Sequence, residues 1–240
     1  MRTLCIDIGG TGIKGMVLDA DAVPVTDRIR VRTPSPAIPA AVFAAIDELL
    51  TKLADFDRVS VGFPGVVVDG ITHTAPNLGE GWGGCALAET LSRRTDRPVR
   101  ALNDCGLQGL GVIEGKGTEI LITLGTGMGF GLYIDGRYVP NVEFGHHPFR
   151  KKKTYEQRVC NAERKAIGKR KWNKRVRDIV EQIEPIFNYR QLYLGGGNAR
   201  YVSAEKLPPN VKIVDNVAGL RGGVKLWQEI RFFSPTAAHP

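Results

Sequence analysis

The fold is decided by residues 6–19, IDIGGTGIKGMVLD, in which two short apolar stretches flank a glycine-rich turn at 9–12. Glycines in such a turn permit positive φ angles and the close approach of another backbone. We therefore predict strands at 2–8 and 13–18 that form a hairpin with an open tip. The turn joins two strands and lacks the pattern G-x-x-x-x-G-K-[ST], so neither a P-loop nor a dinucleotide-binding fold is expected.

The middle of the chain repeats this pattern. Residues 122–135, ITLGTGMGFGLYID, again consist of a strand, a Gly-Thr-Gly turn and a strand, about half a chain length after the first turn. Successive backbone N–H groups in glycine-rich turns form concavities that bind phosphate. The two turns suggest two related halves that hold a polyphosphate-like ligand, and a purely structural hairpin is the alternative for each turn taken singly.

Hydrophobic periodicity predicts an alternation of strands and helices along the rest of the chain, which is typical of an α/β protein. Further strands are expected at 25–32, 58–63, 98–102, 119–124, 129–134 and 190–194, and helices at 38–53, 86–95, 106–113, 155–168, 171–187 and 217–230. The long irregular segment 75–84, APNLGEGWGG, is predicted to be a functional loop.

The composition is that of a globular protein. The chain has 240 residues, 42% of them hydrophobic, which suffices for one large core or two smaller ones. No apolar stretch is long enough for a signal peptide or a transmembrane span, so we expect a cytoplasmic protein without a membrane partner. The four cysteines lie far apart without a Cys-x-x-Cys pair, which predicts neither a zinc knuckle nor a redox motif.

Positive charge is concentrated in residues 150–177. This segment contains 13 Lys and Arg against two Glu, a net +11, and because the whole chain carries +8 the other residues carry −3. Such a patch attracts a linear polyanion. Polyphosphate fits this description, and so does nucleic acid. A solvated helix face is the alternative.

A candidate catalytic group follows the predicted strand 98–102. Phosphoryl transfer to a hydroxyl needs an oriented acceptor for the hydroxyl proton, and a carboxylate can supply it. Asp104 is the candidate base. An Asn-Asp pair before a helix, here Asn103-Asp104, is also typical of a helix cap, so a structural role is open.

Eight motifs together resemble the ROK family (repressor, open reading frame, kinase), and they occur in the family's order. They are IDIGGTGIKG (6–15), GFPG (62–65), APNLGEGW (75–82), LNDC (102–105), ITLGTGMGFG (122–131), EFGHH (143–147), GGGNAR (195–200) and NVAGLRGG (216–223). The set is far more specific than any of its members. Within the family, the short length and the last two motifs look most like the polyphosphate glucokinase branch.

The resemblance implies an α/β, actin-like and hexokinase-like (ribonuclease H-like) fold of two domains with a sugar-binding cleft. We expect a smaller domain at 1–103 and a larger domain at 104–240, with the last predicted helix able to pack back on the first domain. The resemblance also implies a homodimer.

The resemblance further implies roles for individual residues. Asp104 matches the general base. Sugar-binding roles fall on Asn103, Glu143, His146, Glu156, Asn77 and Gly65. Phosphate-binding roles fall on Asp7, Gly9, Gly10, Thr11, Gly12, Lys14, Gly125, Thr126, Gly127 and Gly129. Residues Gly195, Gly196, Gly197 and Asn198 are expected to bind the part of the phosphoryl donor that is not transferred. A capping role for His146 and a simple exposed-strand role for Lys14 are the structural alternatives.

Magnesium is the expected metal, with Asp7 orienting a magnesium-bound water. The ROK zinc site follows Gly-His with three clustered cysteines, whereas Gly145-His146 is followed here by HPFRKKKTYEQRVC with Cys160 alone. We therefore expect no zinc, and the loop that bears His146 must be held by packing and hydrogen bonds.

The sequence thus predicts a hexose kinase that phosphorylates glucose at the 6-hydroxyl with polyphosphate, ATP or both. The alternatives are an ATP-only kinase for mannose, fructose or a similar sugar, a sugar-binding pseudokinase, and a non-catalytic ROK regulator. Regulators carry an added N-terminal DNA-binding domain, whereas this chain starts at the first glycine-turn strand, so nucleic acid is not the expected partner.

Overall fold

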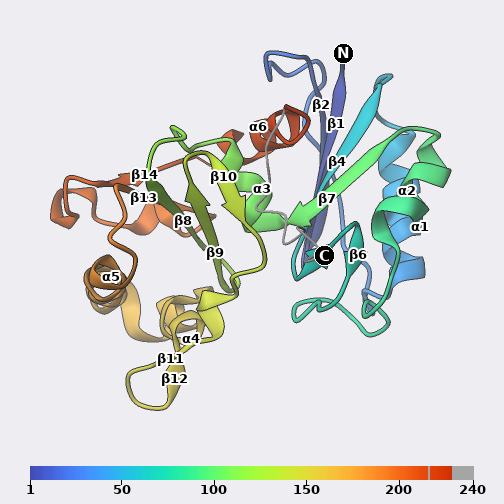
Figure 1. The fold of residues 1–240 in the computed structure, drawn as a ribbon. Helices are drawn as coiled ribbons and strands as arrows, with labels where there is room; N and C mark the ends of the chain where they lie inside the picture. The colour runs from blue at the N-terminus through green and yellow to red at the C-terminus, as the bar shows by residue number, and fades with distance from the viewer. Residues whose placement is uncertain (216, 229–240) are drawn as a thin grey trace, which may run out of the picture. The chain divides into compact units, whose positions relative to one another are not determined.

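The computed structural model describes residues 1–215 and 217–228. The chain divides into two compact units, each with its own sheet (Figure 1). The first unit contains Met1–Gly111 and a C-terminal piece that begins at Gly219, and the second contains Val112–Ala218. Within the described part of the chain, no helix combines the length and the apolar character needed to cross a membrane.

The first sheet has five strands in the order β3-β2-β1-β4-β7. Their bounds are Ile29–Val31, Gly12–Leu18, Thr3–Gly9, Arg58–Phe63 and Val99–Asn103. The β1–β2 and β2–β3 pairs are antiparallel, whereas β1–β4 and β4–β7 are parallel. The carboxyl ends of β1, β4 and β7 therefore meet at one edge of the sheet.

Helices cover both faces of this sheet. On one face, alternate β1 residues Leu4, Ile6 and Ile8 pack with α1 (Pro39–Leu50) and α2 (Leu87–Thr95). On the other face, α6 (Val217–Lys225) packs on Cys5 through Leu220 and Val224, and α3 (Asp104–Leu110) lies over β4 and β7. This alternation is the period of two expected of a strand buried on both sides.

Hydrogen bonds attach the C-terminal piece to the first sheet. The Ser60 hydroxyl donates to the carbonyl of Gly223 at 2.6 Å and accepts from Nε1 of Trp227 at 2.8 Å. Arg100 Nη1 donates to the carbonyl of Leu226 at 2.8 Å. The last helix is therefore a structural part of the N-terminal unit.

The second sheet repeats the strand order and directions of the first, with the order β10-β9-β8-β13-β14. The bounds are Arg137–Val139, Met128–Ile134, Thr118–Leu124, Gln191–Gly195 and Val211–Ile213. The first two pairs are again antiparallel and the last two parallel. This shared topology is the outcome expected from the repeated strand, glycine turn and strand in the sequence.

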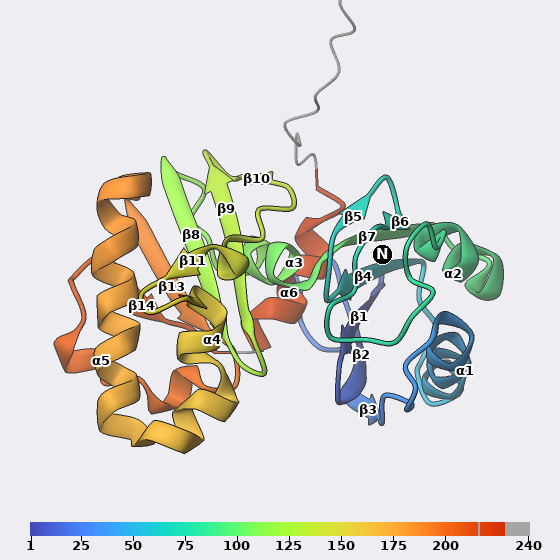
Figure 2. The same ribbon diagram turned by 90° about the horizontal axis from the view of Figure 1, so that it is seen from below.

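One face of the second sheet is covered by α5, Asn161–Phe187, which runs beside β8, β13 and β14 (Figure 2). Trp172, Val176 and Ile183 of this helix pack on the strands. The helix turns at Gly168, whose φ of 77° is in the region that favours glycine.

The short elements are two hairpins, one small helix and three 3-10 turns. They are β5 (Val67–Val68) with β6 (Ile71–Thr72), β11 (Pro148–Phe149) with β12 (Lys153–Thr154), α4 (Tyr155–Val159), η1 (Phe144–His146), η2 (Ala199–Tyr201) and η3 (Ala204–Lys206). The α4 and η1 segments contact each other and β9.

Some predicted elements differ from those observed. The strand expected at 25–32 is reduced to Ile29–Val31. The backbone N–H of Val17 donates to the side chain of Thr26, and the carbonyl of Val17 accepts from the N–H of Val25. The chain therefore turns at these residues and does not continue the strand. The helix expected at 155–168 is broken at Cys160, which has an extended ψ of 163°. The helix expected at 217–230 ends at Lys225, and positions 229–230 lie outside the described residues.

Candidate active site

The first glycine turn connects β1 to β2. Gly9 pairs directly with Gly12, so the tip consists of Gly10 and Thr11. None of the three glycines has a φ in the left-handed region, and the positive φ angles suggested by the sequence are not used. Glycine is instead needed at position 10 because another part of the chain packs closely against it. A Cβ atom at Gly10 would lie 3.0 Å from the carbonyl oxygen of Asn77. The predicted functional loop therefore touches the tip of the turn.

Two side chains that sequence analysis did not single out hold this turn. The Thr33 hydroxyl donates to the carbonyl of Gly9, and Nη2 of Arg30 donates to the carbonyl of Thr11 at 2.8 Å. A Cβ atom at Gly12 would lie 2.7 Å from Cζ of Arg30. The signal available in the sequence was the Arg-x-Arg-x-Arg alternation that ends the predicted strand 25–32.

Asp7 and Lys14 are direct cross-strand partners beside the turn. Their side chains form an ion pair with 2.7 Å between Nζ and Oδ2, and about a third of each is exposed. Mg²⁺ is usually held by one or two carboxylates together with phosphate and water. A single carboxylate such as Asp7 therefore suits a magnesium ion that takes most of its ligands from phosphate and water. Among the described residues no group of three His, Cys, Asp or Glu side chains could enclose a metal.

Asn103 ends β7 and caps α3. Its Oδ1 accepts from the backbone N–H of Gly106 at 3.0 Å, and its Nδ2 donates to the carbonyl of Gly65 at 3.2 Å. Only 7% of the residue is exposed. A Cβ atom at Gly65 would collide with the carbonyl of Thr74. The structure thus joins two predicted sugar ligands, Asn103 and Gly65, in one buried contact with a structural role.

Asp104 is the first residue of α3, and its Oδ1 accepts from the backbone N–H of Cys105 at 2.7 Å. A carboxylate at this position is stabilised by the positive end of the helix dipole. The residue lies over Gly62 of β4, where a Cβ atom would be 3.3 Å from Cα of Asp104. Gly62 is the cross-strand neighbour of Asp7. The candidate base and the phosphate-side carboxylate therefore occupy adjacent places at the carboxyl edge of the first sheet.

The second glycine turn, between β8 and β9, is enclosed by the predicted donor-side loop. Asn198 donates from its backbone N–H to the carbonyl of Leu124 at 2.8 Å and from Nδ2 to the carbonyl of Gly125 at 3.2 Å. Gly196 has a φ of +82°, and a Cβ atom there would lie 2.6 Å from the nitrogen of Leu124. The loop Gly195, Gly196, Gly197 and Asn198 and the turn Gly125, Thr126 and Gly127 thus form one contact region.

Glu156 of α4 lies against the same turn. Its Oε2 accepts from the backbone N–H of Met128 at 3.0 Å, and a Cβ atom at Gly127 would be 2.9 Å from its Cδ. The absence of a side chain at Gly127 therefore makes room for the carboxylate. Glu156, one of the predicted sugar ligands, is therefore attached to the second glycine turn.

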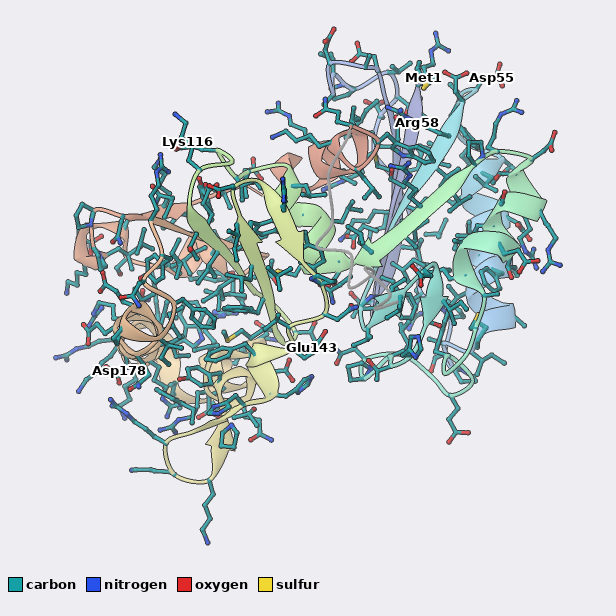
Figure 3. The ribbon with its side chains drawn as sticks, in the orientation of Figure 1. Met1, Asp55, Arg58, Lys116, Glu143 and Asp178 are labelled. Carbon is teal, nitrogen blue, oxygen red and sulfur yellow. The ribbon has the colours of Figure 1, made fainter. Side chains whose placement is uncertain are left out.

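Glu143 directly precedes η1, and His146 is the last residue of η1. Figure 3 shows Glu143 at the end of the second sheet that carries this turn. Nε2 of His146 is 3.6 Å from Oε2 of Glu143. A Cβ atom at Gly145 would lie 2.5 Å from the carbonyl oxygen of Met128, so close packing fixes the segment on β9. Burial raises the pKa of Glu143, the His146 charge lowers it and the Glu156 charge raises it. Three predicted sugar ligands therefore form one electrostatically coupled cluster.

Replacing Glu143 by Gln is expected to stabilise the fold at neutral pH. Because its pKa is raised, folded Glu143 holds its proton more tightly than the unfolded chain does. Its contribution to stability is then lost as pH rises from about 4.3 through the folded pKa. The melting temperature of the variant should exceed that of the wild type at pH 7, and the two melting temperatures should become equal near pH 4. A less stable variant at pH 7 would contradict this reading.

Aromatic packing holds the segment that bears these ligands. The ring of Phe144 lies 5.0 Å from Phe130, 5.4 Å from Phe187 and 4.7 Å from Tyr155, measured between centroids, and His147 stacks on it at 5.7 Å. Edge and tilted contacts of this kind stabilise beyond the buried area alone. The packing that the sequence required of this loop is thus supplied by rings from β9, α4 and α5.

The basic segment continues from this cluster into α4 and α5. Arg164 donates to Oδ1 of Asn161 at 2.9 Å, and the backbone N–H of Asn161 donates to the carbonyl of Gly125 at 2.8 Å. Arg175 and Lys153 pair with Glu163. Of the other cations, Lys151 and Lys152 are exposed between β11 and β12, and five are exposed in α5, namely Lys165, Lys169, Arg170, Lys171 and Lys174. The start of α5 therefore contacts the second glycine turn, and the exposed cations of this helix lie on both sides of the bend at Gly168.

A model of the ROK family matches residues 3–164. The chain belongs to the ROK family. Among its relatives, the polyphosphate glucokinase of Mycobacterium tuberculosis (strain CDC 1551 / Oshkosh) is 32% identical over 234 residues, which cover 90% of this chain and 88% of that protein. The N-acetylmannosamine kinase of Escherichia coli O139:H28 is 35% identical over 144 residues, 57% of this chain and 49% of its own.

Solved structures of ROK proteins have the same fold. The inorganic polyphosphate/ATP-glucomannokinase of Arthrobacter sp. strain KM superposes with a TM-score of 0.85 at 29% identity, covering 94% of this chain and 97% of its own. The ROK family glucokinase of Streptomyces griseus, in complex with glucose and AMPPNP, gives 0.79 at 20% identity over 94% and 99%. The expected α/β, actin-like and hexokinase-like fold class is confirmed, and the relatives identify this ROK chain as a sugar kinase, a phosphotransferase.

Proposed function

We propose that the chain phosphorylates glucose at the 6-hydroxyl, with inorganic polyphosphate and ATP as alternative donors. The observation that carries the proposal is the adjacency of Asp104 and Asp7 at the edge of the first sheet, beside a turn of backbone N–H groups. Phosphoryl transfer to a hydroxyl needs these parts, a proton acceptor and a phosphate cradle. The polyphosphate glucokinase relatives and the glucomannokinase structure support the choice of sugar and donor.

In the proposed reaction, Asp104 accepts the proton of the sugar hydroxyl. The hydroxyl oxygen forms a bond to the terminal phosphorus, the bond from that phosphorus to the bridging oxygen breaks, and the remaining donor leaves with the electron pair. The hydrogen bond from the Cys105 N–H to Asp104 orients the carboxylate, and the helix dipole favours its ionised form. An ionised carboxylate has the lone pairs that a general base requires.

The sugar-binding part of the proposal assigns hydroxyl contacts to Glu143, His146 and Glu156. Carboxylates accept two hydrogen bonds each and imidazole donates or accepts, which suits a ligand with several hydroxyls. In the first unit, Asn103, Gly65 and Asn77 complete the proposed set. Asn103 already uses both ends of its amide in contacts with the protein, so it fixes the position of the sugar-facing backbone as well as contributing polar atoms.

The phosphate-binding part assigns the donor to the two glycine turns and to the loop of Gly195, Gly196, Gly197 and Asn198. Asp7 and Lys14 flank the first turn. Magnesium, held through Asp7, would supply charge neutralisation on the phosphoryl oxygens. The backbone N–H groups of the turns would stabilise the charge that develops in the transition state without having to reorganise.

Polyphosphate is the donor that the charge distribution favours. The exposed cations of α5 continue from the second glycine turn, and a linear polyanion meets more of them than ATP does. A solvated helix face is the alternative, and the salt dependence below distinguishes the two. The proposal also includes a homodimer, which rests on the family resemblance, and a cytoplasmic location, which rests on the apolar stretches being too short for a signal peptide or a membrane span.

A panel of hexoses with ATP and polyphosphate as donors, read as sugar phosphate formed, tests the function. We expect glucose 6-phosphate from both donors, and a steeper loss of activity with salt for polyphosphate than for ATP. In a variant with Lys169, Arg170 and Lys171 all changed to Gln, the polyphosphate slope should fall while the ATP slope stays. If no hexose yields a product, the kinase proposal is refuted. If activity falls equally steeply with salt for both donors, the proposal that the exposed cations of α5 bind polyphosphate is refuted.

A further inference from the structure

We propose that Arg30 is a donor-binding residue that contacts the phosphate held at the first glycine turn. This inference rests on the proposed function and adds to it a residue outside every motif of the family resemblance. It predicts that the guanidinium sets the affinity for the phosphoryl donor, whether polyphosphate or ATP, and leaves the affinity for the sugar unchanged.

Strand register places Arg30 in a row that leads to the candidate base. Arg30 on β3 pairs with Lys14 on β2, Lys14 pairs with Asp7 on β1, and Asp7 pairs with Gly62 on β4. Residues directly opposite each other in paired strands lie on the same face of a sheet. Asp104 lies over Gly62 at the other end of this row. Arg30 therefore shares one face of the sheet with the groups that the reaction uses.

Charge accounting within the row assigns the net positive charge to Arg30. The ion pair between Lys14 and Asp7 is neutral as a unit. Arg30 donates to a carbonyl oxygen, that of Thr11, and among residues 1–215 and 217–228 no carboxylate lies within ion-pair distance of its guanidinium. Within this row, Arg30 is therefore the cation that is available to a phosphate beside the first turn.

The guanidinium is also held in place before any ligand binds. Its contact with the Thr11 carbonyl and its close approach to Gly12 fix it at the turn. A guanidinium has five N–H donors in a rigid fork, and one of them is used here by Nη2. The residue is exposed, so the remaining donors are open to a phosphate, to which arginine binds through two parallel hydrogen bonds.

Bracing of the turn is the structural alternative, since the bond to Thr11 would also stabilise the loop. The two roles predict different results. If Arg30 only stabilises the turn, its loss should lower kcat and thermal stability with either donor. If Arg30 contacts phosphate, its loss should raise the donor KM and weaken the binding of phosphate chains that do not react.

The test uses Arg30→Met, Arg30→Lys and, as the matched control, Arg28→Met. Arg28 lies two residues earlier in the same segment and is exposed, so its variant loses the same charge at a greater distance from the turn. We expect Arg30→Met to raise the KM for ATP and for polyphosphate about tenfold, with the glucose KM unchanged. Arg30→Lys should recover part of the loss, and Arg28→Met should change the donor KM by less than about twofold.

Calorimetric titration with inorganic tripolyphosphate gives a readout that does not require turnover. We expect about tenfold weaker binding in Arg30→Met and wild-type binding in Arg28→Met. If the wild-type protein phosphorylates no sugar, the proposed function fails, yet this binding difference still supports the inference. Equal tripolyphosphate affinity in the two Met variants, or a fall in kcat and melting temperature at unchanged donor KM, would overturn it.

Discussion

Replacing Asp104 by Asn is expected to reduce kcat by a factor of about 10² to 10⁴, the range that a general base contributes. The amide cannot take the hydroxyl proton, but its oxygen can still accept from the N–H of Cys105, as the carboxylate does at 2.7 Å. The fold and the start of α3 should therefore survive. Initial rates with saturating glucose and donor give kcat, and calorimetric titration with glucose reports binding.

The control for this substitution is Asp69→Asn in the same unit. Asp69 is exposed at the tip of the β5–β6 hairpin with a φ of 49°, a conformation that Asn tolerates as well as Asp does. Its variant should keep wild-type kcat and stability. A kcat of Asp104→Asn within about threefold of this control would remove Asp104 from the role of base.

The largest effect on stability is expected from Glu119→Gln. Glu119 on β8 is completely buried, and its carboxylate accepts from the backbone N–H groups of Glu114, Gly115 and Lys116 at 2.9, 2.7 and 3.0 Å and from the hydroxyl of Tyr193 at 2.9 Å. An amide in its place brings two further donors toward these donors. The loss should be about 3 to 5 kcal/mol of unfolding free energy, as for other broken buried networks.

Urea unfolding of Glu119→Gln can be compared with Glu114→Gln from the same loop. Glu114 is paired with Arg190 and Lys212 on the surface, where ion pairs contribute little, so that variant should stay close to wild type. Figure 3 shows Lys116, in the loop bound by Glu119, and Glu143 at opposite ends of the second sheet. Sugar binding by folded Glu119→Gln should therefore be normal. Equal unfolding midpoints for the two variants would contradict the account.

Local sequence determines much of this fold. The hairpins β1–β2 and β8–β9 follow from apolar alternation around glycine turns, and β4 is observed at the predicted 58–63. Alternation failed at 25–32, where a side chain, Thr26, takes over a backbone partner of Val17. Such competition depends on neighbours that periodicity does not reveal.

The site was predictable in its parts and less so in its contacts. The glycine turns and Asn103-Asp104 stand out as motifs in the sequence. The need for glycine at two of these positions comes from tertiary contacts, because Gly10 and Gly127 leave room for Asn77 and Glu156. Arg30 reaches the first turn because β3 pairs with β2 at the edge of the sheet. Pairing between strands that are distant along the chain is information that a single sequence does not carry.

The return of α6 to the first sheet has a consequence for synthesis on the ribosome. The face of β1 that carries Cys5 is covered by a helix that begins at Val217, so the N-terminal unit cannot close when its own strands emerge. At translation rates of about 5 to 20 residues per second, the wait is on the order of 5 to 20 s. Until residues 217–225 have been synthesised, this face of β1 lacks its helix, and the nascent N-terminal unit should remain sensitive to protease up to that point.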